Sequence, residues 1–100
     1  MTYRLAIRAD QDVAEILRWS AGRHGVSLAF EYVDALYDGF ARIAERPDLG
    51  NGIGRHGLLW RLLTPGEGHV AIYRVRADDV EIVRVFHTRQ NWAPRARRLR

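Results

Sequence analysis

Two strand-like runs that lie close together near the C-terminus constrain the fold of this chain most. They cover residues 69–75 and 80–87, and a tight turn at residues 77–79 separates them. A connection this short joins antiparallel strands. Residues 58–63 form a third apolar run, and a Pro-Gly turn at residues 65–68 leads from it to the next strand. The sequence therefore predicts a three-stranded antiparallel meander in the second half of the chain.

The first half of the chain predicts a strand followed by a helix. Residues 3–8 alternate apolar and basic side chains, which is the period of a half-buried strand. Asp12 and Glu15 have the spacing of a capping box. A helix is therefore predicted to begin there and to continue to Gly22, before a turn at Gly25.

A second, longer helix is predicted from Ser27, a capping residue, to Arg46. Pro47 ends this helix, because proline disfavours helical geometry in the residue before it. Residues 48–57 contain four glycines and are predicted to form a mobile loop. The buried stripe of the helix is predicted to consist of Ala29, Val33, Leu36, Phe40, Ile43 and Ala44.

The predicted fold class is α+β: an N-terminal strand, a two-helix hairpin and a three-stranded antiparallel meander with the helices on one face. A chain of 100 residues suits one small domain, predicted here to span residues 1–93. Residues 94–100 form a basic tail that is predicted to be loosely ordered, because Pro94 argues against a strand that continues through it.

Composition argues against several classes of protein. No apolar run approaches about eighteen residues, so neither a membrane span nor a signal peptide is expected. The chain has no cysteine, which excludes disulfides and favours a cytoplasmic location. The four histidines lie on different predicted elements without metal-ligand spacing, so no metal and no other cofactor is expected.

The positive charge of the chain is concentrated at its C-terminal end. Six arginines and no acidic residue follow Glu81, whereas the part up to Glu81 has ten arginines and twelve carboxylates. All sixteen basic residues are arginine, which suits bidentate contacts with phosphates and carboxylates. A coding bias of a GC-rich genome is the alternative explanation for the missing lysine. The asymmetry itself indicates an anionic partner.

A series of short landmarks spans nearly the whole chain. They are residues 3–5, 12–16, 25–29, 46–50, Arg61, 69–75 and 80–87, followed by the basic tail. Their order and spacing resemble the RelE/ParE superfamily of type II toxin–antitoxin toxins, and specifically its ParE branch. The resemblance implies a compact toxin that a cognate antitoxin neutralises, and an antitoxin whose N-terminal part binds the operon DNA. Toxins of the ParE branch inhibit DNA gyrase, and those of the RelE branch cleave messenger RNA on the ribosome.

Metal-free RNA cleavage requires a base, an acid and cations for the developing phosphorane charge. The chain lacks the lysines and the late tyrosine of RelE-like enzymes: no tyrosine follows Tyr73, and Arg95 falls near the expected position. Arginine stays protonated and serves poorly as a base. If the chain is nevertheless a ribonuclease, the predicted catalytic set is His87 with Arg61, Arg84 and Arg89. The other interpretation of His87 is that it ends a strand and packs beside Trp92.

Two groups of residues are predicted to form binding surfaces. Trp19 is predicted to be an exposed indole that binds the antitoxin. The alternative is that its side chain closes the edge of the helical hairpin. The strand at residues 3–8 can accept an added antitoxin strand, although its arginines can also discourage aggregation. The predicted target-binding residues are Arg61, Arg84, His87, Arg89, Trp92 and Arg95. The predicted antitoxin-binding residues are Trp19, Tyr3, Arg4, Arg97 and Arg98.

The sequence thus predicts a toxin that inhibits DNA gyrase by binding and not by catalysis. It is predicted to form a hetero-oligomer with its cognate antitoxin and to reach operon DNA only through that antitoxin. Two alternatives stay open. One is a RelE-like, ribosome-dependent mRNA endonuclease that needs no metal, and the other is a non-toxic relative that binds an antitoxin.

Overall fold

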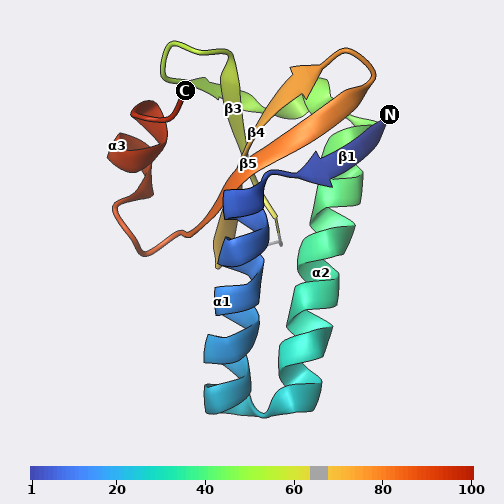
Figure 1. Cartoon of the computed structure of the whole chain (residues 1–100), viewed down its shortest axis with the longest axis vertical. Helices are drawn as coiled ribbons and strands as arrows, with labels where there is room; N and C mark the ends of the chain where they lie inside the picture. Colours follow the sequence, from blue (N-terminus) through green and yellow to red (C-terminus); the bar gives the residue numbers. More distant parts are fainter. Residues whose placement is uncertain (64–67) are drawn as a thin grey trace.

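The structure is a computed structural model that describes residues 1–63 and 68–100. A helical hairpin packs on one face of a twisted sheet, and a short C-terminal helix lies on the other side (Figure 1). The elements in chain order are β1 (Thr2–Leu5), α1 (Ile7–His24), α2 (Val26–Glu45), the 3₁₀ turn η1 (Pro47–Leu49), β2 (Asn51–Ile53), β3 (Leu58–Leu62), β4 (His69–Arg76), β5 (Asp79–His87) and α3 (Trp92–Arg97).

The described strands form one mixed sheet with the order β1-β5-β4-β3-β2. The predicted meander is present as β3, β4 and β5, which are antiparallel neighbours. Two further strands extend it at both edges. β1 pairs in parallel with β5, from Thr2 opposite Asp79 to Leu5 opposite Ile82. The sheet is therefore mixed, and not the simple three-stranded meander that the sequence predicted.

The strand β2 lies in the glycine-rich segment that was predicted to be a loop. Its three residues pair with β3, where Asn51 is opposite Trp60 and Ile53 is opposite Leu58. Pairing satisfies backbone groups that would otherwise be left unbonded along the edge of β3. The glycines at 54 and 57 have φ values of 71° and 72°, which close the turn between the two strands.

The core between the hairpin and the sheet contains the predicted stripe of α2. All six predicted positions are buried: Ala29, Val33, Leu36, Phe40, Ile43 and Ala44. Gly39 lies on the same side, where a Cβ atom would be only 2.5 Å from the carbonyl oxygen of Leu63. The absence of a side chain thus lets α2 approach the end of β3 closely. The predicted end of this helix is confirmed within one residue, since α2 stops at Glu45.

The opposite face of the sheet has a second, smaller core under α3. Ile53, Leu58, Val70, Ile72 and Phe86 are buried there with Ala96 of α3. The segment predicted as a loosely ordered tail from residue 94 differs in the structure, because α3 begins at Trp92 and includes Pro94. Proline is tolerated in the first turn of a helix, where the backbone N–H groups have no intrahelical partner.

The ends of the first two helices differ from the prediction. The strand predicted to reach Arg8 stops at Leu5, because α1 already begins at Ile7. The capping box at Asp12 is wrong, since this residue lies inside α1 and its carboxylate bonds to β5. α1 continues past Gly22 to His24, and α2 begins directly after Gly25, whose φ is 88°.

The predicted turn at residues 65–68 falls largely outside the described residues. None of the described helices has the length and apolar character needed to cross a membrane.

Candidate functional site

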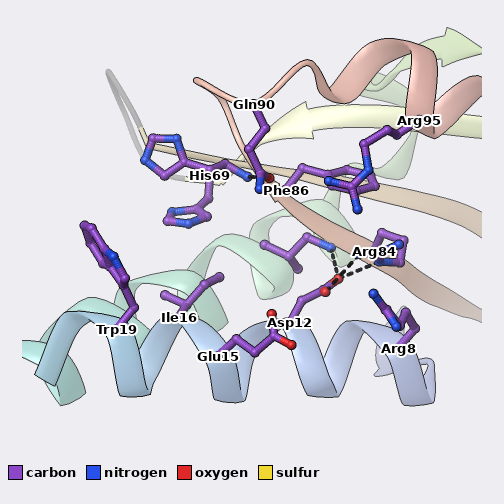
Figure 2. A pocket seen from close by; sticks show the side chains of 12 residues that line it. Arg8, Asp12, Glu15, Ile16, Trp19, His69, Arg84, Phe86, Gln90 and Arg95 are labelled. Atoms are coloured by element: carbon purple, nitrogen blue, oxygen red, sulfur yellow. Dashed lines mark hydrogen bonds and ion pairs between the residues drawn. The ribbon is translucent and has the colours of Figure 1, made fainter. Parts of the chain in front are cut away.

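An open cavity of about 450 Å³ lies between α1 and the end of β5, and we call it the α1–β5 groove. One face of α1 forms the first wall, and the end of β5 with the following loop and α3 forms the second (Figure 2). The lining residues are Arg8, Asp12, Glu15, Ile16 and Trp19 of α1, His69 of β4, Arg84, Val85, Phe86 and His87 of β5, Gln90 of the loop and Arg95 of α3.

A buried ion pair joins the two walls of the groove. Arg84 donates from Nε to Oδ2 of Asp12 over 2.8 Å and from Nη2 to Oδ1 over 3.1 Å. The backbone N–H of Val85 donates to the same Oδ2 over 2.9 Å. The side chain of Asp12 is only 7% exposed, and that of Arg84 is only 12% exposed. Because the contact is bidentate and largely desolvated, Arg84 is held in place by the fold and its charge is neutralised by Asp12.

Two guanidinium groups lie against the ring of the buried Phe86. The Cζ atom of Arg84 is 4.6 Å from the ring centroid, and that of Arg95 is 4.8 Å from it. Contacts at this distance are favourable cation–π interactions. They position Arg95, which is itself exposed on α3, at the rim of the groove. Arg95 and Arg8 thus provide positive charge at this end.

Two histidines meet in the middle of the groove. The rings of His69 and His87 are 4.9 Å apart between centroids, in an edge-to-face arrangement. Nδ1 of His69 is 2.5 Å from the hydroxyl of Tyr32. Burial, together with a smaller effect of the neighbouring His87, lowers the pKa of His69 from 6.5 to about 4. His69 is therefore neutral at neutral pH.

His87 is held by the loop that follows β5. Its Nδ1 accepts the backbone N–H of Arg89 over 3.0 Å, and its own backbone N–H donates to Oε1 of Gln90 over 3.1 Å. Since Nδ1 is an acceptor, the neutral imidazole carries its proton on Nε2. The ring of His87 contacts that of His69, whereas the ring of Trp92 contacts that of Trp60.

The other end of the groove is apolar. Trp19 is 57% exposed, and the guanidinium of Arg23 lies 4.9 Å from the centroid of the indole. A smaller hollow of about 190 Å³ continues the groove from here toward α2. Its lining includes Ile16, Trp19, Tyr32 and the two histidines. The groove is therefore polarised along its length, with an aromatic end and a cationic end.

The structure brings together only part of the predicted target-binding set. Arg84, His87 and Arg95 line the groove. Arg61 lies elsewhere, and its Nη1 donates to the carbonyl oxygen of Arg46 at the end of α2 over 3.1 Å. Arg89 is exposed beside the groove. Trp92 packs against Trp60 on the other face of the sheet, with 5.2 Å between ring centroids.

The predicted antitoxin-binding residues lie in three separate places. Trp19 is in the groove, next to the predicted target-binding residues. Tyr3 packs on Phe40 of α2, and burial raises the pKa of its hydroxyl. Its neighbour Arg4 pairs with carboxylates of β5, on the edge strand β1. The remaining two residues, Arg97 and Arg98, are exposed at the end of α3.

Several residues of the groove were missed by sequence reasoning. Arg8, Asp12 and Glu15 are spaced so that they share one face of α1 with Trp19, the residue of this wall that was predicted to bind a partner. That spacing was readable, but nothing in the sequence indicated that this face lies opposite β5. His69, Phe86 and Gln90 come from segments far from α1 in the chain, so only the tertiary fold identifies them. Among the described residues no group of three or more His, Asp or Glu side chains could hold a metal ion.

Comparisons with known proteins define the class to which this fold and groove belong. Residues 3–92 match the model of a family described as the ParE toxin of type II toxin–antitoxin system, parDE. Toxin ParE1 of Caulobacter vibrioides is 37% identical over 89 residues, which are 89% of this chain and 91% of that protein. A solved structure of the chromosomal ParDE TA system from P. aeruginosa has the same fold, with a TM-score of 0.72 at 19% identity. The aligned region covers 87% of this chain and 95% of the chain in that structure.

These matches define a toxin of a type II toxin–antitoxin system. Within that class, the chain belongs to the ParE toxin family. The resemblance inferred from the sequence landmarks is thereby confirmed.

Proposed function

We propose that this chain is a cytoplasmic toxin that inhibits DNA gyrase by binding and that a cognate antitoxin neutralises it. The observation that carries the proposal is the α1–β5 groove, which has the chemistry of a protein-binding site without a complete catalytic set. Aromatic surface at Trp19, positive charge at Arg8 and Arg95, and the carboxylate of Glu15 line it, together with Asp12, whose carboxylate is paired with Arg84. Such a groove suits a segment that is apolar at one end and acidic at the other.

The arrangement of the arginines argues against RNA cleavage. A ribonuclease would need free cations around His87 to stabilise the phosphorane. Of the predicted catalytic arginines, Arg84 is engaged by Asp12 through two hydrogen bonds and Arg61 bonds to a backbone carbonyl at the end of α2, which leaves only the exposed Arg89 of that set open to a phosphate. His69, the other histidine near His87, is buried and has its pKa lowered to about 4. It is therefore neutral at neutral pH and supplies no cation.

The groove also suggests how neutralisation works. Trp19, proposed to bind the antitoxin, lines the same cavity as Arg84, His87 and Arg95, proposed to bind gyrase. A bound antitoxin segment would therefore exclude gyrase directly, without any change in the fold of the toxin. The toxin and antitoxin form a hetero-oligomer, in which the antitoxin recognises the operon sequence.

A supercoiling assay tests the gyrase proposal. Purified toxin should inhibit gyrase on relaxed plasmid, and Arg95→Ala should raise the concentration for half-inhibition about tenfold, the effect of losing about 1.4 kcal/mol. Arg18→Ala is the matched control, because this arginine is exposed on α1 outside the groove. Expression of the toxin should induce the SOS response.

Other outcomes would support the alternatives. Rapid translation arrest that His87→Ala abolishes would indicate a ribonuclease. Normal growth on expression of the folded chain would indicate a non-toxic relative. Equal loss of inhibition in Arg95→Ala and Arg18→Ala would show that gyrase inhibition does not depend on the groove.

Antitoxin binding is tested with Trp19→Ala. Truncation of an aromatic anchor costs about 2 kcal/mol, so the Kd for the antitoxin should rise about 30-fold. Leu28→Ala is the control, because Leu28 is 56% exposed, like Trp19, but does not line the groove. If a preformed toxin–antitoxin complex still bound gyrase, direct exclusion would be wrong.

A further inference from the structure

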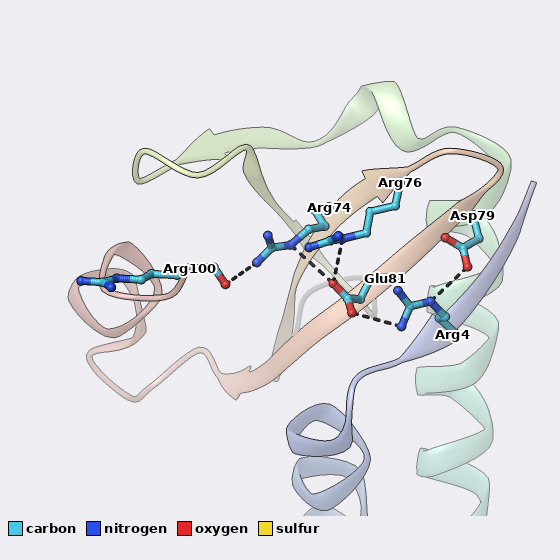
Figure 3. Close-up of polar contacts among 6 residues, drawn as sticks. All are labelled: Arg4, Arg74, Arg76, Asp79, Glu81 and Arg100. Carbon is cyan, nitrogen blue, oxygen red and sulfur yellow. Dashed lines mark hydrogen bonds and ion pairs between the residues drawn. The ribbon is translucent and has the colours of Figure 1, made fainter.

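We propose that a second surface of the toxin binds the phosphate backbone of duplex DNA. This surface, the basic face, lies on the side of the sheet that faces away from α1 and α2 (Figure 3). It consists of Arg4, Arg74 and Arg76 of the sheet and of the exposed C-terminal segment that Arg74 contacts through Arg100, which also carries Arg97 and Arg98 at the end of α3. The inference concerns the free toxin and DNA, and it stands whether or not gyrase is the target.

Three arginines of the sheet converge on one carboxylate. Nη1 of Arg4 is 3.1 Å from Oε2 of Glu81, while Nε of Arg76 and Nε of Arg74 are 3.3 Å and 3.5 Å from Oε1. Arg4 also pairs with Asp79 over 3.1 Å. A guanidinium has five N–H donors, so Arg4 and Arg76, whose side chains are 51% and 54% exposed, retain accessible donors after these contacts, whereas the Arg74 side chain is only 15% exposed. Glu81 therefore fixes the positions of these side chains without occupying all of their N–H donors.

These side chains share one face because of the strand register. Arg4 and Arg74 lie opposite Glu81 on its two sides, in β1 and β4. Their neighbours Tyr3 and Tyr73 point the other way, into the core under the helical hairpin. The row continues to the C-terminal segment, where Nη2 of Arg74 donates to the main-chain oxygen of Arg100 over 2.5 Å. In Figure 3 the contacts run from Arg100 across the sheet to β1.

The basic face carries an excess of positive charge. Six arginines belong to it, and Glu81 and Asp79 are the carboxylates they contact among the described residues. Arg97 and Arg98 form no ion pair within the part of the chain that the structure describes. The helical hairpin on the other side is acidic, with seven carboxylates and four arginines in α1 and α2. The toxin therefore presents two faces of opposite charge.

The composition of the basic face favours phosphates over a protein partner. A protein interface needs apolar anchors at its centre. None of the large apolar side chains exposed in the described residues belongs to this row, and Val75, between Arg74 and Arg76, points to the opposite face. The cavities described above do not include these arginines either. Exposed guanidinium groups on a surface without apolar anchors are suited to hydrogen-bond the phosphates of a nucleic-acid backbone.

Fluorescence anisotropy of a labelled 20-base-pair duplex with the free, full-length toxin tests the proposal. Each phosphate contact contributes about −0.9 to the slope of log K against log salt concentration. With four contacts, affinity should fall about 150-fold between 50 and 200 mM salt. Duplexes of different sequence should bind equally, because backbone contacts carry no sequence information. Recognition of the operon sequence thus remains with the antitoxin.

Paired variants with the same net charge locate the contact. Arg76→Gln with Arg98→Gln should leave about two contacts, so the same salt change should reduce affinity only about 12-fold. Arg18→Gln with Arg23→Gln, on α1, should behave like the wild type. The proposal is overturned if both pairs weaken binding equally, if the first pair has no effect, or if polyglutamate displaces the duplex at equal charge concentration. The last result would assign the face to an acidic protein.

Discussion

Replacing Asp12 with alanine should destabilise the toxin strongly, because it removes one partner of a buried ion pair. The change leaves the Arg84 guanidinium, whose side chain is only 12% exposed, without its carboxylate. It also leaves the N–H of Val85 without its acceptor. Breaking a buried pair in this way costs about 3–5 kcal/mol. The free energy of unfolding of a small domain is about 5–15 kcal/mol, so this loss is a large fraction of it.

Urea unfolding followed by tryptophan fluorescence measures this loss. With a slope of about 2 kcal/mol per molar urea, a loss of 4 kcal/mol lowers the midpoint by about 2 M. The double variant Asp12→Ala with Arg84→Met removes both charges. It should therefore be more stable than the sum of the two single losses predicts, by about 2 kcal/mol.

Asp48→Ala is the matched control for burial. Arg46 contacts Asp48 through two hydrogen bonds of 2.9 and 3.1 Å, a geometry like that of the buried pair, but both side chains are 62% exposed. Its removal should leave the midpoint nearly unchanged, because solvent screens exposed pairs. A loss below about 1 kcal/mol for Asp12→Ala would refute the reasoning, since that is the range of exposed pairs.

Two further predictions concern pH and packing. The pKa of His69 is about 4 in the fold and 6.5 when unperturbed, so the unfolded chain takes up the proton first and stability falls as pH drops. The loss between pH 7 and 5 should be about 2 kcal/mol, and denaturant unfolding of His69→Gln should show a correspondingly weaker pH dependence. Gly39→Ala should destabilise by about 1–3 kcal/mol through overpacking against Leu63. In Gly22→Ala on α1 the added Cβ meets open space, so this variant should instead be more stable by up to about 1 kcal/mol. A higher melting temperature for Gly39→Ala than for Gly22→Ala would contradict this packing.

The elements that depend on local periodicity could be predicted from the sequence. The buried stripe of α2 follows from helical spacing, and its end follows from Pro47. The central three strands follow from short turns between apolar runs. These features are set by residues close together in the chain, so no knowledge of the tertiary fold is needed to find them.

The features that depend on distant partners could not be predicted. Asp12 has the sequence signature of a helix cap, but its partner Arg84 lies 72 residues away and determines its role. Residues 92–97 contain a proline and several charges, and they are helical because Ala96 is buried over Ile53, Leu58 and Phe86. The site prediction therefore included Arg84, His87 and Arg95 of one wall and Trp19 of the other, and it missed Arg8, Asp12 and Glu15 on α1.

The parallel pairing of β1 with β5 has a consequence for synthesis of the toxin on the ribosome. Thr2 is opposite Asp79, so the first strand has no partner until the residues of β5 have been added. At about 5–20 residues per second, residue 82 follows residue 2 by roughly 4–16 seconds. The second wall of the groove comes later still, because it includes Arg95. A nascent chain that lacks β5 and α3 therefore has no complete groove, and the surface proposed for gyrase and antitoxin forms only after Arg95 has been added.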